Sequence, residues 1–229
     1  MNTTVIPASS IEFLKKLSKN NNREWFNKNK DRYLKEYESM IAFADALLKE
    51  MRKHDTIETN SGKDSLFRIY RDTRFSNDKT PYKTYWAGRF KRATKKLRGG
   101  YYFQIEPGAS FAAVGFFAPN PADLLRIRQD IDYNFADWKK LLASKKIANS
   151  FGAIKGEKVS TAPKGFSKSS PGIELLRHKQ FYFERYFTDD EVLDKKFVIE
   201  LSNTFKNIRP WLDYMSDVLT TDLNGEPVA

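Results

Sequence analysis

The side chains best suited to binding an anion lie in one cationic window of the sequence. Between Lys63 and Arg98 there are twelve Lys or Arg against three Asp, which is +9 of a formal net charge of +11. Arginine keeps its charge at any working pH, and its planar guanidinium binds phosphates and carboxylates through paired hydrogen bonds. The predicted ligand-binding residues lie in the basic segment, residues 68–84, and are Arg68, Arg71, Asp72, Arg74, Asp78, Lys79, Tyr82 and Lys83.

These residue types favour a basic pocket for a small molecule that carries a phosphate or a carboxylate. Two or three arginines would bind the anion, Lys79 or Lys83 would add charge, and Tyr82 would donate a hydrogen bond. Asp72 would orient an arginine, because the surrounding cations lower its pKa and suit it to positioning better than to general acid catalysis.

The alternative is a structural network of ion pairs within the basic segment. If residues 66–75 are extended, alternate side chains point to opposite faces, and Arg71 and Phe75 share an apolar face with Phe67. An unpaired guanidinium there is costly, so Arg71 needs a bound anion, Asp78 or a carboxylate from elsewhere in the chain. Pocket and network both stay open, because both place cations beside carboxylates.

The same segment resembles the signature of a bacterial family, domain of unknown function 2461. The matching residues are Arg68, Arg71-Asp72, Arg74-Phe75, Asp78-Lys79 and Tyr82, with further similarity at Asn21 to Phe26, Pro163 to Phe166 and Glu174 to Arg177. The resemblance covers essentially the whole chain. It implies one domain in an intracellular bacterial setting, and it implies no reaction, cofactor or catalytic residue.

Cysteine and histidine usage limits the chemistry that the chain can perform. There is no cysteine, and His54 and His178 are the two histidines. A thiol nucleophile and a Cys-based zinc site are therefore excluded. Two histidines are few for a His-based metal site or a Ser-His-Asp triad. The sequence predicts no metal site and identifies no cofactor or catalytic residue, so whether the protein is an enzyme stays open.

The N-terminus and the hydropathy pattern predict a soluble, cytoplasmic protein without a membrane partner. Residues 1–7 lack a basic segment followed by an apolar one. No apolar run approaches the ~20 residues that a membrane helix needs.

Apolar periodicity predicts both helices and strands. Apolar residues recur at three- and four-residue steps over 33–51, and again from Phe197 onward, as on long amphipathic helices. Four ranges read as strands: 85–92, 101–106, 111–117 and 181–187. The first three are joined by short turns and must therefore be antiparallel neighbours. We expect a single α+β domain over 1–229, with a central antiparallel meander packed by several long helices and a flexible tail at 222–229.

A second class of function is nucleic-acid binding through a basic, aromatic face of the sheet. Candidate stacking residues are Tyr82, Tyr85, Trp86, Phe90, Tyr101 and Tyr102, and the predicted phosphate contacts are Lys91, Lys95, Lys96 and Arg98. Aromatic residues on strands are also ordinary core. A third class is a non-catalytic structural or partner-binding protein with a basic face.

Overall fold

The computed structural model describes residues 4–93, 95–222 and 226. They form two compact units, each built from three stretches of the chain. Unit 1 consists of Met1–Phe90, Tyr102–Ala112 and Tyr186–Asn203, and unit 2 of Lys91–Tyr101, Ala113–Arg185 and Thr204–Ala229. Most of the predicted tail at 222–229 lies outside the described residues.

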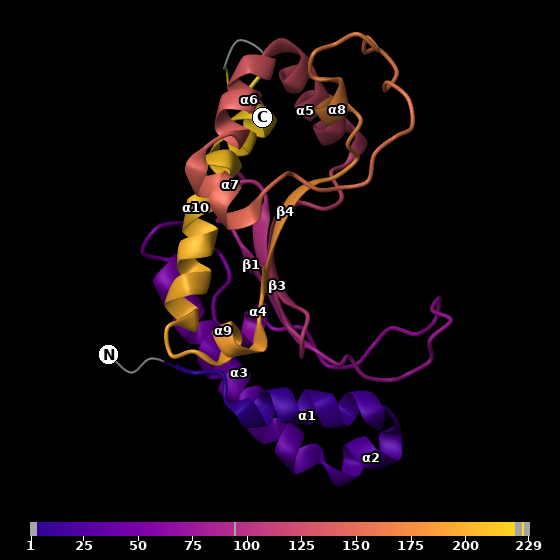
Figure 1. Ribbon diagram of the computed structural model, residues 1–229, viewed down its shortest axis with the longest axis vertical. Coiled ribbons are helices and arrows are strands. Elements are labelled where there is room, and N and C mark those ends of the chain that lie inside the picture. Colours follow the sequence, from indigo (N-terminus) through magenta and orange to yellow (C-terminus); the bar gives the residue numbers. More distant parts are fainter. Residues whose placement is uncertain (1–3, 94, 223–225, 227–229) are drawn as a thin grey trace. The chain divides into compact units, whose positions relative to one another are not determined.

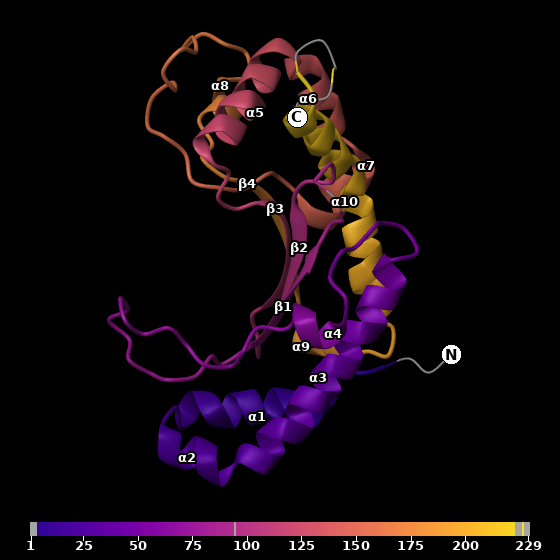
Figure 2. The same ribbon diagram turned by 180° about the vertical axis from the view of Figure 1, so that it is seen from behind.

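The predicted antiparallel meander is confirmed. Its strands are β1 (Trp86–Lys91), β2 (Gly100–Ile105), β3 (Ser110–Phe116) and β4 (Phe181–Phe187). They lie side by side in the order β1-β2-β3-β4 (Figures 1 and 2). Each strand has residues in both units. Together with the helices this sheet makes the α+β fold that the sequence predicts.

Unit 1 packs helices on one face of its strands. Its helices are α1 (Ala8–Lys19), α2 (Arg23–Lys28), α3 (Lys30–Met51), α4 (Gly62–Ser65) and α9 (Asp189–Leu193). The apolar stripe of α3 is buried, and its Phe43 ring lies 5.6 Å from Phe103 of β2 and 5.9 Å from Phe197. We call the face with Phe103 the covered face. Gly62 lets α4 approach α3, since a Cβ at this position would lie 2.4 Å from the Asp45 nitrogen.

Unit 2 is held together by a buried carboxylate as well as by apolar packing. Its helices are α5 (Pro121–Tyr133), α6 (Phe135–Leu142), α7 (Lys145–Phe151), α8 (Ile173–Leu176) and most of α10 (Phe197–Thr220). Asp130 of α5 accepts hydrogen bonds from Trp138 Nε1 of α6 and from the Tyr214 hydroxyl of α10, each at 2.7 Å. Among the described residues, no helix combines the length and apolar character needed to cross a membrane.

Candidate functional site

The basic segment forms an irregular antiparallel hairpin, which we call the arm (residues 66–85). Bridges join Leu66 to Gly88 of β1 and Tyr70 to Tyr82. Arg71 N donates to Pro81 O at 2.9 Å, and Lys83 N donates to Ile69 O at 2.8 Å. Figures 1 and 2 both show this hairpin extending from the edge of the sheet at β1. The extended conformation that the sequence predicts is therefore found along the two sides of the arm.

Tyr82 anchors the base of the arm to the helices of unit 1. Its backbone N donates to Asn21 Oδ1 at 3.1 Å, and its carbonyl accepts from Asn21 Nδ2 at 2.8 Å. Its ring stacks on Phe26 of α2, with centroids 4.0 Å apart, and the residue is 4% exposed. This burial raises the pKa of the Tyr82 hydroxyl. Tyr82 fixes the position of the arm, and its donation to a ligand stays a prediction.

Two arginines of the arm pair with aspartates of the arm. The Arg71 guanidinium bonds to Asp78 and to the Thr80 hydroxyl, so Asp78 is the carboxylate partner that the sequence suggested. The pKa of Asp78 is lowered to about 2, chiefly by the Thr80 backbone N–H and then by Arg71. Arg74 donates to both carboxylate oxygens of Asp72, at 3.0 and 2.6 Å, which lowers the pKa of Asp72.

Of the remaining cations of the arm, two donate to backbone carbonyls and one has no partner among the described residues. Lys79 Nζ donates to Thr73 O at 2.9 Å, and Lys83 Nζ donates to Arg68 O at 2.8 Å. Arg68 is exposed, and its guanidinium has no hydrogen-bond or ion-pair partner within the described part of the chain. Burial, and then the charge of Arg68, lower the pKa of Lys83. The described side chains of the predicted site thus form separate groups along the arm, with Tyr82 packed at its base.

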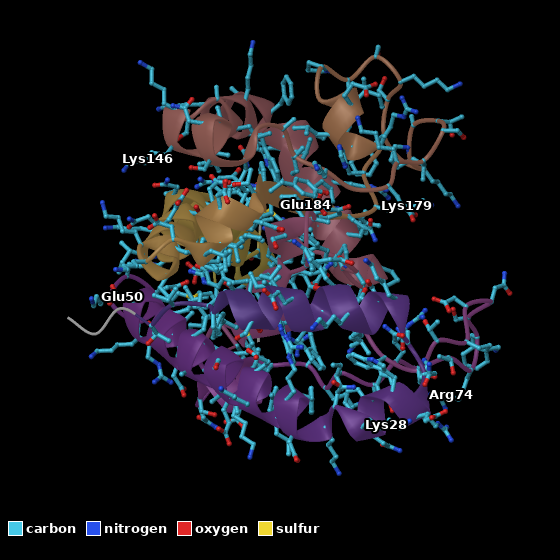
Figure 3. All side chains as sticks on the ribbon, turned by 60° about the horizontal axis from the view of Figure 1, so that its bottom comes forward. Lys28, Glu50, Arg74, Lys146, Lys179 and Glu184 are labelled. Carbon is cyan, nitrogen blue, oxygen red and sulfur yellow. The ribbon has the colours of Figure 1, made fainter. Side chains whose placement is uncertain are left out.

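The prediction that Phe75 lies on an apolar face is wrong. Phe75 is 96% exposed. The alternation of an extended strand ends where the arm turns, and there Ser76 N donates to Thr73 O at 3.4 Å. Figure 3 shows the neighbouring Arg74 at the outer end of the arm. Phe75 therefore sits at a turn rather than on a strand.

A continuous row of aromatic rings crosses the other face of the sheet in unit 1, which we call the open face. The aromatic row consists of Phe67, Tyr102, Phe111 and Tyr186, from the arm, β2, β3 and β4. Successive ring centroids lie 6.2, 5.6 and 5.6 Å apart. Phe67 is 41% and Tyr186 59% exposed, while Tyr102 and Phe111 are partly exposed.

Strand alternation explains why these rings meet. Phe103 packs on α3, so its neighbour Tyr102 points to the open face. Phe67 N donates to Ala87 O at 2.9 Å, which places the Phe67 ring beside the small Ala87 side chain. Because Ala87 fills little space, a ring from the arm reaches across β1 to Tyr102.

Polar and cationic groups border the aromatic row. The Tyr102 hydroxyl donates to Gln104 Oε1, and Gln104 Nε2 donates to Glu106 Oε2, each at 2.6 Å. Burial, followed by Tyr85 and Glu106, raises the pKa of Tyr102, so its hydroxyl stays neutral. Lys83 Nζ lies 5.6 Å from the centre of the Phe67 ring.

Arg89 adds a second cation to the open face. Phe90 stacks with Phe103 on the covered face, so the preceding residue, Arg89, points to the open face. It is exposed and has no partner among the residues that the structure describes. This guanidinium is therefore free to bind a phosphate.

The described residues of the β1–β2 turn (92, 93 and 95–99) agree in part with the predicted cationic surface: Lys95 and Lys96 are exposed, as is Lys91 at the end of β1, whereas the two arginines are taken up by ion pairs. Arg92 is 1% exposed and pairs with Asp213. Arg98 pairs with Asp123, and its backbone N donates to Ser216 Oγ at 2.9 Å. These two arginines hold unit 2 together.

The predicted stacking residues also divide between the two faces. Trp86, Phe90 and Tyr101 are buried in the core, whereas Tyr85 and Tyr102 are partly exposed. The sequence did not identify Phe67, Phe111 and Tyr186 as stacking residues. The alternation of apolar and polar residues over 181–187 does place Tyr186 on the solvent-facing side of its strand. Residues 111–117 are apolar on both faces, so the sequence does not indicate that Phe111 is exposed.

The fold is α+β, and in unit 1 its antiparallel sheet has one face covered by helices and one face with an aromatic row. A family model described as "Conserved hypothetical protein (DUF2461)" matches residues 9–214. The chain belongs to this family, which confirms the resemblance noted in the sequence. Comparison with curated proteins and comparison with solved structures each found no match. Within the described residues, no group of three or more His, Asp or Glu could hold a metal ion.

Proposed function

We propose that unit 1 binds single-stranded nucleic acid on the open face of its sheet. The observation that carries this proposal is the aromatic row, in which rings from four segments are in contact and those at its two ends are 41% and 59% exposed. Every base has a flat face, so stacking on aromatic side chains binds single strands without requiring a particular sequence. A sheet with exposed aromatic residues is one of the established surfaces for such stacking.

The charges beside the row support a polyanionic partner. Lys83 lies over the Phe67 ring, and Arg89 has no partner among the described residues, so both are suited to contact phosphates. The formal net charge of +11 attracts a polyanion over longer distances. Glu106 is an anionic group of this surface, and its oxygens accept from Gln104 and Thr84.

A single strand fits these contacts better than a small anion does. Arg71 and Arg74 already bind the carboxylates of Asp78 and Asp72. A small phosphate would have to displace these carboxylates in order to use the same guanidinium groups. Nucleic acid on the open face leaves both ion pairs intact.

The test is the binding of a fluorescent oligothymidine of about 15 nucleotides, measured by anisotropy at about 50 mM salt. Phe67→Ala and Tyr186→Ala should each weaken binding by about 5-fold to 150-fold, which corresponds to about 1–3 kcal/mol per stacked base. The matched control is Tyr133→Ala, since Tyr133 is 84% exposed at the end of α5 in unit 2. The control should bind as the wild type does.

Three outcomes would contradict the proposal. The first is no oligonucleotide binding at low salt, and the second is an affinity that Phe67→Ala and Tyr186→Ala leave unchanged. The third is a rise in melting temperature with inorganic phosphate or a nucleoside monophosphate that Arg71→Ala abolishes. The third result would favour the small-anion pocket.

A further inference from the structure

Phe75 at the end of the arm is exposed in an unusual setting. A single exposed aromatic residue is ordinary on a protein surface. Phe75, however, is 96% exposed at a turn whose two sides are both fixed by charged side chains. The ring is therefore accessible to a partner and its position is restricted before the partner binds.

The contacts on either side of Phe75 restrict the turn. Before it, Arg74 binds both carboxylate oxygens of Asp72, at 3.0 and 2.6 Å. After it, Thr80 N donates to Asp78 Oδ1 at 2.9 Å, and Asp78 also pairs with Arg71. A ring on a restricted turn loses little conformational entropy when it binds.

The charges around Phe75 point to a nucleic-acid partner. The Arg74 guanidinium carbon lies 5.8 Å from the centre of the Phe75 ring. An apolar protein pocket or a lipid core that received the ring would also have to desolvate this cation, at a high cost in free energy. A base stacked on the ring leaves the Arg74–Asp72 ion pair intact in water, and Lys79, whose Nζ donates to the Thr73 carbonyl and to no carboxylate among the described residues, is the cation suited to contact the phosphate.

We propose that Phe75 stacks on the exposed terminal base pair where a duplex meets a single strand. This inference rests on the proposed function, and it adds a preference for the form of nucleic acid. An aromatic or apolar wedge that enters an intact duplex must unstack a base step, which costs about a few kcal/mol. At a junction one face of the last base pair is already free, and the adjoining single strand is available to the aromatic row.

The experiment compares two ligands for the full-length protein. One is a single-stranded oligonucleotide, and the other has the same single strand joined to a short duplex with 2-aminopurine at the junction. The wild type should bind the junction about 5-fold or more tightly than the single strand and quench the 2-aminopurine fluorescence. Phe75→Ala should lose both the preference and the quenching but keep its single-strand affinity, whereas Phe75→Trp should retain the preference.

Any other result overturns the inference about Phe75. The results also distinguish a failure of this inference from a failure of the proposed function. If Phe75→Ala keeps the junction preference, or the wild type has none, Phe75 does not stack there, although single-strand binding still stands. If neither ligand binds, both proposals fail. Binding to phosphatidylcholine–phosphatidylserine vesicles that depends on Phe75, without junction binding, would make the arm a membrane contact instead. Because Phe75 is almost fully exposed, an unchanged melting temperature should accompany these variants.

Discussion

Arg71 in the arm and Arg92 in the β1–β2 turn each pair with an aspartate, but their surroundings differ. The side chain of Arg71 is 25% exposed and that of its partner Asp78 57%. The side chain of Arg92 is fully buried, and that of its partner Asp213 is 41% exposed. An exposed ion pair contributes little stability, whereas removing one partner of a buried charge leaves the other uncompensated. We infer that the arm arginines shape a surface, and that the turn arginines stabilise unit 2.

The largest expected effect follows from removing the partner of Arg92. Asp213→Ala should destabilise the protein by about 3 kcal/mol, because the buried Arg92 guanidinium and Arg209 both lose the Asp213 carboxylate. Urea unfolding measures this loss, and oligonucleotide binding by the folded variant should stay unchanged. Asp217→Ala is the control, since Asp217 is exposed on the same helix, α10. An Asp213→Ala midpoint equal to that of the control would contradict the assignment of Arg92 to the core.

A smaller effect concerns the salt dependence of binding. Each phosphate contact to a single strand contributes about −0.7 to the slope of log K against log salt concentration. Arg89→Ala should therefore make the slope shallower by about 0.7. Lys146→Ala, which removes an exposed cation of α7 in unit 2, should leave the slope unchanged. If Lys95→Ala in the β1–β2 turn changes the slope and Arg89→Ala does not, the phosphate contacts lie in the turn and not on the open face.

The smallest effect is a pH dependence of the arm. The pKa of Asp78 is about 2, below its ordinary value, so this carboxylate stabilises the folded state above its unfolded pKa of about 4. The contribution is lost as the pH falls from about 4 toward about 2. Asp78→Asn should therefore lower the urea midpoint at neutral pH, and the difference from wild type should vanish near pH 2. Asp31→Asn is the control, because Asp31 is exposed and has no partner among the described residues. A constant difference at all pH values would show that the charge of Asp78 is not the cause.

Most of the fold could be predicted because its signals are local. The buried stripe of α3, the alternation of β4 and the two glycines at the start of β2, Gly99 and Gly100, each lie within a short stretch of sequence. The partner of Arg71 was among the alternatives that the sequence offered, since Asp78 is a carboxylate only seven residues away. Each of these inferences needs only the rules for one element or one turn.

The aromatic row could not be predicted, because its rings come from segments far apart in the sequence. Phe67 and Tyr186 are separated by about half of the chain, and only the register of the arm, β2, β3 and β4 brings the four rings together. The position of Phe75 was missed for a related reason. Side chains alternate between the two faces of a strand only while the strand continues. The sequence did not show that the arm turns between Asp72 and Asp78.

Photocrosslinking would show which residues of the protein contact a bound single strand. A single strand with 5-bromouracil at every position would be irradiated in complex with the full-length protein, and the attached peptides would be identified by mass spectrometry. Binding on the open face predicts crosslinks at residues of the aromatic row, above all at the exposed Phe67 and Tyr186. Crosslinks confined to the β1–β2 turn, with none at the aromatic row, would show that nucleic acid does not bind on the open face.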